Sequence, residues 1–149
     1  MVLLMGAFVY DFYSVKTDDT KTSLFLLGMR VVFGTLMMLH GLQKWNAFEQ
    51  MSSGFPDPIG LGSSTSLVLA IFGELICSLA FILGFLYRLS LIPMIVTMVV
   101  AFFIVHGADP FVVKELAFIY LIVFLLMYFI GPGKYSLDSI LKKLIKHKR

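Results

Sequence analysis

The sequence predicts an all-α membrane protein, a bundle of four transmembrane helices with a C-terminal amphipathic helix at the membrane interface. Three observations predict this fold class. Of the 149 residues, 59% are hydrophobic and only 14% are charged, whereas about 25% of residues are charged in an ordinary soluble domain. Four apolar stretches approach or reach the roughly 20 helical residues that cross a hydrocarbon core of about 30 Å. The C-terminal residues alternate apolar side chains and lysines at helical spacing.

The four apolar stretches form one predicted transmembrane domain, from residue 24 to residue 133. Its predicted helices span residues 24–45, 66–87, 91–106 and 111–130. They must be α-helices, because lipid leaves no backbone group unpaired and four strands cannot close a barrel. Pro93 is expected in the first turn of the third helix, where its missing N–H costs little. Gly131-Pro132-Gly133 is expected to end the fourth helix.

One connection is long. It runs from residue 46 to residue 65, and its prolines and glycines predict an ordered, irregular loop against the mouth of the bundle. Residues 1–23 form an N-terminal extension whose apolar part is too short to cross the bilayer. Without a preceding positive charge it fits a signal peptide poorly, so we expect an interfacial or disordered segment. The first helix has candidate N-caps at Thr20, Thr22 and Ser23.

Residues 134–149 are expected to form a basic amphipathic tail on the cytoplasmic side. One helical face carries Leu137, Ile140, Leu141, Leu144 and Ile145, with lysines between them. This pattern is typical of a helix in the headgroup region of an anionic leaflet, and the alternative is a solvated tail. The basic excess of the chain therefore lies beside the membrane, which argues against binding of nucleic acid.

The placement of lysine and arginine predicts that both termini are cytoplasmic. In that orientation the outer side has only Lys44 and Lys114, both at helix ends. The inner side then receives Lys16, Lys21, Arg88, Lys134, Lys142, Lys143, Lys146, Lys148 and Arg149.

Polar residues gather in the outer half of the predicted bundle: His40, Gln43, Lys44, Glu74, His106 and Glu115. An ionisable group at the centre of a span costs at least about 2.5–3.5 kcal/mol, so each needs a partner or a function. We expect His40, Glu74, His106 and Glu115 to converge on one cavity that forms the functional site. The alternatives are that these groups only satisfy their own hydrogen bonds, and that Lys44 snorkels to the surface.

Arg30 lies about 10–12 Å from the cytoplasmic side at 1.5 Å per residue. We expect it to pair with Glu74, directly or through a water molecule, and the alternative is that it snorkels inwards. Cys77 is the single cysteine, which excludes an intrachain disulfide. It belongs with Gly73 and Gly84 to a face of small residues on the second helix that allows close helix contact.

Several catalytic motifs are absent from the sequence, among them the Glu-x-x-His of di-iron bundles, Cys-x-x-Cys, a glycine-rich phosphate loop and a serine nucleophile elbow. Two histidines and two carboxylates could bind a metal in principle. They are scattered over four helices, so the sequence leaves any metal unknown.

Several segments together resemble the DoxX family. They are residues 27–31 (LGMRV), 39–44 (LHGLQK), 73–75 (GEL), 84–88 (GFLYR), His106, residues 114–115 (KE) and 131–138 (GPGKYSLD). The resemblance covers residues 24–138 and implies a four-helix protein of the bacterial inner membrane. The family is related to the DoxD subunit of thiosulfate:quinone oxidoreductase, which implies a link to quinol oxidation.

The resemblance implies a quinone-linked redox subunit or accessory protein, with the lipid bilayer, a quinone and other membrane or redox subunits as partners. In that role Glu74 or Glu115 would relay protons, and His40 or His106 would bond a quinone carbonyl. Arg30, Gln43 and Lys44 are the expected substrate-binding residues. The alternatives are a non-enzymatic binding or transport protein for a lipid, small solute or metal, and a structural partner in a membrane complex.

Overall fold

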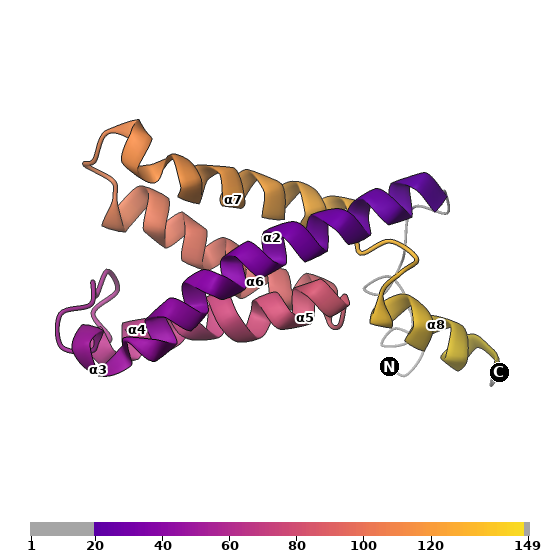
Figure 1. Cartoon of the computed structure of the whole chain (residues 1–149), viewed down its shortest axis with the longest axis horizontal. Helices are drawn as coiled ribbons and strands as arrows, with labels where there is room; N and C mark the ends of the chain where they lie inside the picture. The colour runs from indigo at the N-terminus through magenta and orange to yellow at the C-terminus, as the bar shows by residue number, and fades with distance from the viewer. Residues whose placement is uncertain (1–19, 148–149) are drawn as a thin grey trace, which may run out of the picture.

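The computed structural model describes residues 20–147. Within this range the chain is helical and has no strand. Four helical segments are long and apolar enough to cross a membrane, namely Thr20–Asn46, Ser63–Leu83, Tyr87–Val105 and Phe111–Ile130. The predicted fold class is therefore confirmed, and Figure 1 shows the four segments as one elongated bundle. The expectations for residues 1–19, and for residues 148 and 149, lie outside the described residues.

The first span is a single helix, α2 (Thr20–Asn46), and the fourth is α7 (Phe111–Ile130). The second span joins α4 (Ser63–Ile71), the π-helical turn η1 (Phe72–Ile76) and α5 (Cys77–Leu83). The third joins α6 (Tyr87–Val99) to a second π-helical turn, η2 (Val100–Val105). Two helices lie outside the spans, the short α3 (Phe48–Met51) and the tail helix α8 (Leu137–His147).

The turn between the second and third spans falls earlier than predicted. α5 ends at Leu83, where Gly84 adopts a left-handed conformation (φ 66°) and donates its N–H to the carbonyl of Phe81. A glycine in this conformation is a common helix terminator, because it has no Cβ to clash. α6 then begins at Tyr87, so Pro93 lies inside the helix, and its predicted place in the first turn was wrong.

Glycines bring the first and second spans into close contact, as the small-residue pattern predicts. A Cβ on Gly41 would lie 2.7 Å from the backbone nitrogen of Leu75, and one on Gly34 would lie 2.4 Å from Ile82. Gly73 performs the same role toward the third span, where a Cβ would meet the hydroxyl of Thr97 at 2.7 Å. Backbone contact at Gly41 places the end of α2 directly against η1.

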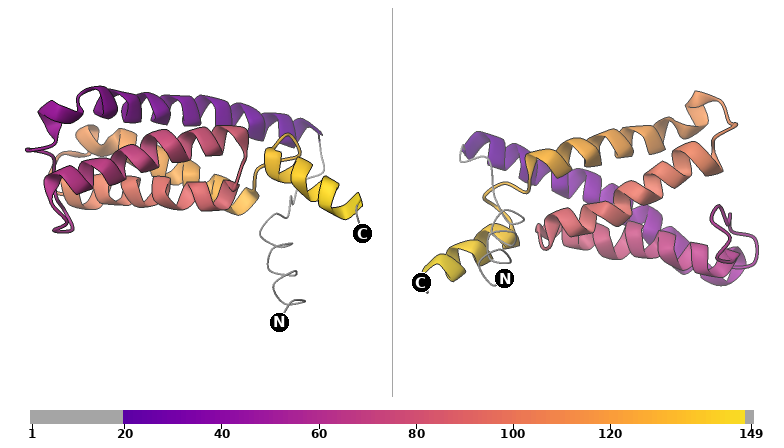
Figure 2. Two further views of the ribbon diagram at one scale, coloured as in Figure 1. Left: turned by 90° about the horizontal axis from the view of Figure 1, so that it is seen from below. Right: turned by 180° about the vertical axis from the view of Figure 1, so that it is seen from behind.

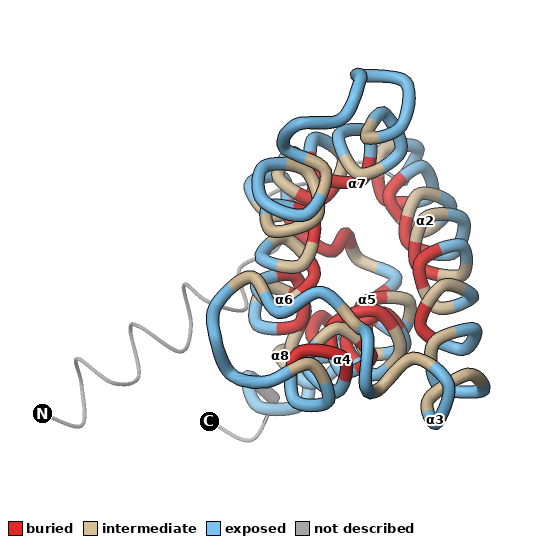
Figure 3. Tube along the Cα trace, turned by 90° about the vertical axis from the view of Figure 1, so that its left-hand side faces the viewer, coloured by how far each residue is buried: buried red, intermediate tan, exposed pale blue. Residues whose placement is uncertain are grey.

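Buried side chains line the interior of the bundle and apolar side chains cover its outside. Phe81, Leu91, Met94 and Phe124 are fully buried, and Figure 3 shows the buried positions on the inward faces of the helices. Large apolar side chains such as Phe129 are exposed on the outward faces. An apolar outer surface on helices of this length fits lipid as the surrounding solvent.

α8 lies at the same end of the molecule as the start of α2 and the α5–α6 turn, as both views of Figure 2 show. The chain leaves α7 at Gly131 and folds beneath this turn before α8 begins. Lys134 donates its backbone N–H to the Ser23 hydroxyl (3.3 Å), which ties the segment to α2. We call this end of the bundle the inner end and the opposite end the outer end.

Candidate functional site

Two π-helical turns position the polar residues at the outer end. η1 carries Glu74, and η2 ends immediately before His106. A π turn inserts an extra residue into the helix and rotates the residues that follow, and such turns are frequent at functional sites. The Nδ1 of His106 lies 2.8 Å from Oδ2 of Asp109. Because an ionised carboxylate can only accept, Nδ1–H is the donor in this contact.

An ion pair joins the first and second spans. The Nζ of Lys44 lies 2.6 Å from Oε2 of Glu74. The Glu74 side chain is 6% exposed and the Lys44 side chain 22% exposed, so the pair is largely withdrawn from solvent. Gly41 makes this possible, because the close approach of α2 to η1 brings the next turn of α2 within reach of Glu74. Lys44 therefore does not snorkel to the surface.

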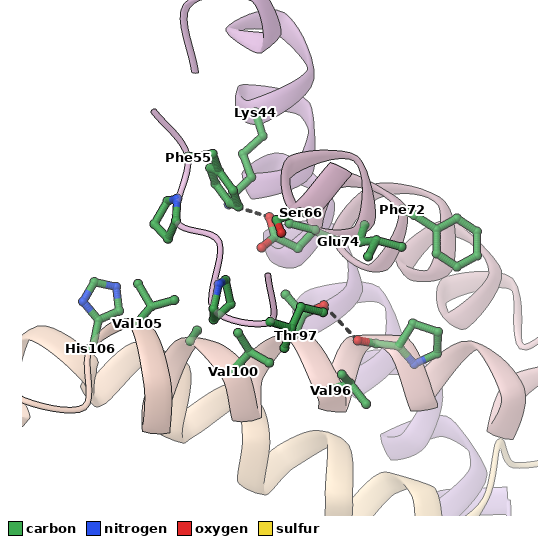
Figure 4. A pocket seen from close by; sticks show the side chains of 17 residues that line it. Lys44, Phe55, Ser66, Phe72, Glu74, Val96, Thr97, Val100, Val105 and His106 are labelled. Carbon is green, nitrogen blue, oxygen red and sulfur yellow. Dashed lines mark hydrogen bonds and ion pairs between the residues drawn. The ribbon is translucent and has the colours of Figure 1, made fainter. Parts of the chain in front are cut away.

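A cavity of about 540 Å³ lies beside this ion pair, between the second and third spans. Its charged or titratable lining residues are Lys44, Glu74 and His106; Figure 4 shows Glu74 near Lys44, and His106 apart from both. The rest of its wall is mainly apolar, with Leu69, Ala70, Phe72, Pro93, Val96, Val100, Ala101 and Val105. Leu69, Phe72 and Val96 are also exposed on the outer surface of the bundle, so this side of the cavity borders the lipid.

The long loop closes the outer end of the same cavity. Phe55, Pro56, Pro58 and Ile59 line it, which confirms that the loop lies against the mouth of the bundle. The Asp57 carboxylate accepts hydrogen bonds from the Ser66 hydroxyl (2.8 Å) and from the N–H groups of Gly62 (2.8 Å) and Leu61 (2.9 Å). These hydrogen bonds, that of Ser66 first, hold the pKa of Asp57 below its usual value. The long loop, anchored in this way by Asp57, is therefore an ordered part of the cavity wall.

A second cavity, of about 200 Å³, lies on the other side of the ion pair. Its lining includes His40 from α2 and Tyr120 from α7, together with Lys44, Glu74 and His106. The rings of His40 and Tyr120 meet edge to face, with centroids 6.1 Å apart. The same three charged or titratable groups thus face both cavities.

Of the residues predicted from the sequence, Lys44 and Glu74 are in direct contact, and His40 and His106 line the second cavity with them. Glu115 and Gln43 are exposed and line neither cavity, so the expectation that Glu115 joins the cluster was wrong. Position along a helix fixes the depth of a residue but not the direction in which it points. Tyr120 was missed, because an aromatic residue among the apolar residues of α7 gives no polar signal.

Arg30 belongs to a different part of the molecule. Arg30 is 1% exposed, and its guanidinium donates to the carbonyl oxygens of Pro132 (2.8 Å) and Tyr135 (2.6 Å) at the inner end. The predicted pair between Arg30 and Glu74 was therefore wrong, since Glu74 bonds Lys44. Two backbone carbonyls take the place of the expected carboxylate.

Asp138 completes this inner cluster; it ends the segment 131–138 that carries the family resemblance, but it was not predicted as a site residue. Its carboxylate accepts hydrogen bonds from the N–H groups of Leu86 and Tyr87, both at 2.9 Å, at the first turn of α6. A carboxylate at a helix N-terminus pairs with orphan N–H groups and with the positive end of the helix dipole. Gly84 lies between the two halves of the cluster, where a Cβ would meet both Arg30 and Ser136 at 2.5 Å.

Among residues 20–147 there is no group of three or more His, Cys, Asp or Glu side chains placed to hold a metal ion. The buried Cys77 is one of the packing residues of the core.

These features define a class: a four-helix membrane protein with a charged pair between two cavities at one end and a closed polar cluster at the other. The family model of DoxX matches residues 25–107, and the chain belongs to the DoxX family. Two relatives are described as uncharacterized proteins of Haemophilus influenzae. One is 31% identical over 141 residues, which cover 89% of this chain and 93% of the relative. The other is 30% identical over 122 residues, covering 77% and 89%. No solved structure matches the chain.

Proposed function

We propose that the chain is a quinone-linked subunit or accessory protein of a bacterial inner-membrane redox complex, and that the larger cavity binds the quinone. One observation carries the proposal. A largely buried ion pair, Lys44–Glu74, lines a cavity that is otherwise mainly apolar and borders the lipid. A cavity of 300–1,000 Å³ with an apolar wall and a few polar groups is typical of a small-molecule site.

The lining of the larger cavity suits the chemical groups of a quinone. Its ring would occupy the apolar cavity, and its long tail would leave between Phe72 and Val96 toward the lipid. The ammonium of Lys44 can donate to a quinone carbonyl, and the carboxylate of Glu74 can accept a proton from the hydroxyl of a quinol. Oxidation of a quinol releases two electrons and two protons. We assign the protons to Glu74 together with His106 and His40, and the electrons to a redox subunit that binds this chain.

The alternative of a transport protein receives less support. Polar groups would have to continue from the cavity to the inner end of the bundle. Phe81, Leu91 and Phe124 are instead fully buried below the site, and Arg30 is bound to two carbonyls. In the other alternative, the chain is a non-enzymatic protein that binds a lipid in the same cavity. The experiment below distinguishes a bound lipid from a bound quinone.

Extraction of the purified protein followed by mass spectrometry identifies what it retains from the membrane. A short-chain quinone can then be titrated into ligand-free protein, with the fluorescence of Trp45 as the readout, because the chain has one tryptophan. We expect the native protein to retain a prenylquinone, and Glu74→Gln to bind the short-chain quinone about tenfold more weakly, which corresponds to about 1.4 kcal/mol.

Glu115→Gln is the matched control, because the same change is made at an exposed residue outside both cavities. It should bind as the native protein does. Retention of phospholipid without quinone, or equal quinone affinity for Glu74→Gln and the native protein, would remove the quinone proposal. The first result would favour the lipid-binding alternative.

A further inference from the structure

The tail helix α8 turns its polar side toward the bundle and its apolar face away from it. A helix that packs on a protein in water does the reverse. The first turn of α8 directs Asp138 and Ser139 toward the bundle, where they are 3% and 4% exposed. Its apolar face points away from the bundle, and the five side chains of that face are between 39% and 64% exposed: Leu137, Ile140, Leu141, Leu144 and Ile145. In water such a helix would bury its apolar stripe against the protein. An apolar environment on this side of α8 would remove the cost of exposing that face.

The contacts of α8 also place its first turn at membrane depth. The backbone N–H of Asp138 donates to the carbonyl of Gly84 (3.0 Å), so α8 begins level with the α5–α6 turn. That turn is level with the side chain of Arg30, since a Cβ on Gly84 would lie 2.5 Å from its Nη1. Arg30 lies ten residues into α2, about 15 Å along the helix axis from Thr20. The first turn of α8 thus lies beside the membrane-spanning part of α2 and not beyond its end (Figure 2).

Charge selects the kind of lipid. From residue 139 to the C-terminus the sequence contains five lysine or arginine residues and no aspartate or glutamate, namely Lys142, Lys143, Lys146, Lys148 and Arg149. The one acidic side chain of α8, Asp138, is bound to the N–H groups of Leu86 and Tyr87. Lys143 and Lys146 are exposed beside the apolar face. A leaflet of zwitterionic lipid satisfies the apolar face but offers no net negative charge to Lys143 and Lys146.

We propose that α8 is a docking surface for anionic phospholipid at the inner leaflet, with its apolar face among the acyl chains and its lysines at the phosphates. The Asp138 and Arg30 contacts hold the helix against the bundle, so binding of anionic lipid also stabilises the inner end of the spanning helices. The surface is independent of the quinone site, which lies at the outer end.

The test uses the full chain with Cys77→Ser, reconstituted in vesicles of phosphatidylcholine alone or with about 30% phosphatidylglycerol. An environment-sensitive fluorophore is attached at Leu144→Cys, and at Lys143→Cys as the matched control on the polar side of the same helix. We expect lipid-borne quenchers to reach the label at position 144, and to quench it at least about twofold more in the anionic vesicles. The label at position 143 should remain accessible to aqueous quenchers.

A second measurement needs no label. Hydrogen exchange of the backbone amides of residues 140–147 should be about tenfold slower in the anionic vesicles. The variant with Lys142, Lys143 and Lys146 all changed to Gln should lose that difference. Equal quenching in both kinds of vesicle would overturn the selectivity for anionic lipid. A label at position 144 that reports water in both, or one shielded from lipid that crosslinks to a second copy, would overturn the lipid surface itself.

Discussion

Lys44 and Arg30 meet the cost of a positive charge at membrane depth in two different ways. Lys44 turns inward and pairs with Glu74, whereas Arg30 donates to the carbonyls of Pro132 and Tyr135. The sequence gives the depth of both residues, since the rise per residue of a helix is constant. It cannot give the partner of Arg30, because every residue has a carbonyl and only the fold decides which ones are left without a helical partner.

The Lys44–Glu74 pair should couple the two side chains energetically. We expect Lys44→Met and Glu74→Gln each to destabilise the protein, because each leaves a largely buried charge unpaired. The double variant should be less destabilised than the sum of the two, by about 1–3 kcal/mol. A double-mutant cycle of unfolding in a bilayer or detergent measures this coupling.

The matched cycle combines Arg30→Leu with Glu74→Gln. These residues bond different partners at opposite ends of the bundle, so their effects should add within about 0.5 kcal/mol. Coupling between Arg30 and Glu74, or additivity between Lys44 and Glu74, would contradict the contacts described here.

Gly41 and Gly28 lie on the same helix and allow a second comparison. A Cβ on Gly41 would meet the backbone of Glu74 and Leu75 at 2.7–2.8 Å, whereas a Cβ on Gly28 would meet nothing within 4 Å. Gly41→Ala should therefore separate α2 from η1 and destabilise the protein by about 1–3 kcal/mol. Gly28→Ala should be neutral or stabilising by up to about 1 kcal/mol, because alanine favours a helix over glycine. Equal stability of the two variants, measured by thermal unfolding in detergent, would show that the Gly41 contact is looser than described.

At the scale of the elements, hydropathy located all four spans but missed how two of them are built. A stretch of apolar residues long enough to cross the bilayer is evident from the mean hydropathy along the sequence. The π turns η1 and η2 are not, because they change the hydrogen-bond register without changing the hydropathy. The direction in which the Glu115 side chain points could not be predicted from the sequence either. It shares the outer half of the bundle with Glu74, but the rotation of α7 about its own axis depends on packing with its neighbours.

The long loop gives a prediction that depends on pH. The pKa of Asp57 is lowered below 3.8 by hydrogen bonds that only the folded loop supplies, that of Ser66 first. The stabilisation of the loop is therefore fully present above that value, and it is lost as the pH falls through the lowered pKa. We expect the amide proton resonances of Leu61 and Gly62 to shift toward random-coil positions in acid.

Asp57→Asn provides the control for the loop. An asparagine keeps one acceptor and does not titrate in this range, so the same two amide resonances should respond far less to acid. A native protein whose Gly62 resonance does not change as the pH is lowered from neutral through the lowered pKa of Asp57 would contradict the anchoring role of Asp57.

At the scale of the whole molecule, the two ends of the bundle differ in kind. The inner end is closed by Arg30 and Asp138, which bind backbone groups of segments far away in the sequence. The outer end contains both cavities and the ion pair between them. The two cavities and the ion pair thus lie at one end of the bundle only, which suits the proposal that the protein binds its ligand in that half of the membrane.

The side on which the cavities open follows from the charges of the loops, and this gives the last prediction. Lysine and arginine residues crowd the inner end, and the rule that positive loops stay in the cytoplasm predicts that this end is inside. A membrane-impermeant maleimide should then react in whole cells with Gly54→Cys, in the exposed long loop, and not with Lys146→Cys, in α8. Both changes are made in a Cys77→Ser background, because Cys77 is the single cysteine. Both sites should react after the membrane is broken, which shows that each cysteine is reachable. Labelling of Lys146→Cys alone in intact cells would reverse the predicted orientation, and the proposed quinone site would then face the cytoplasmic leaflet.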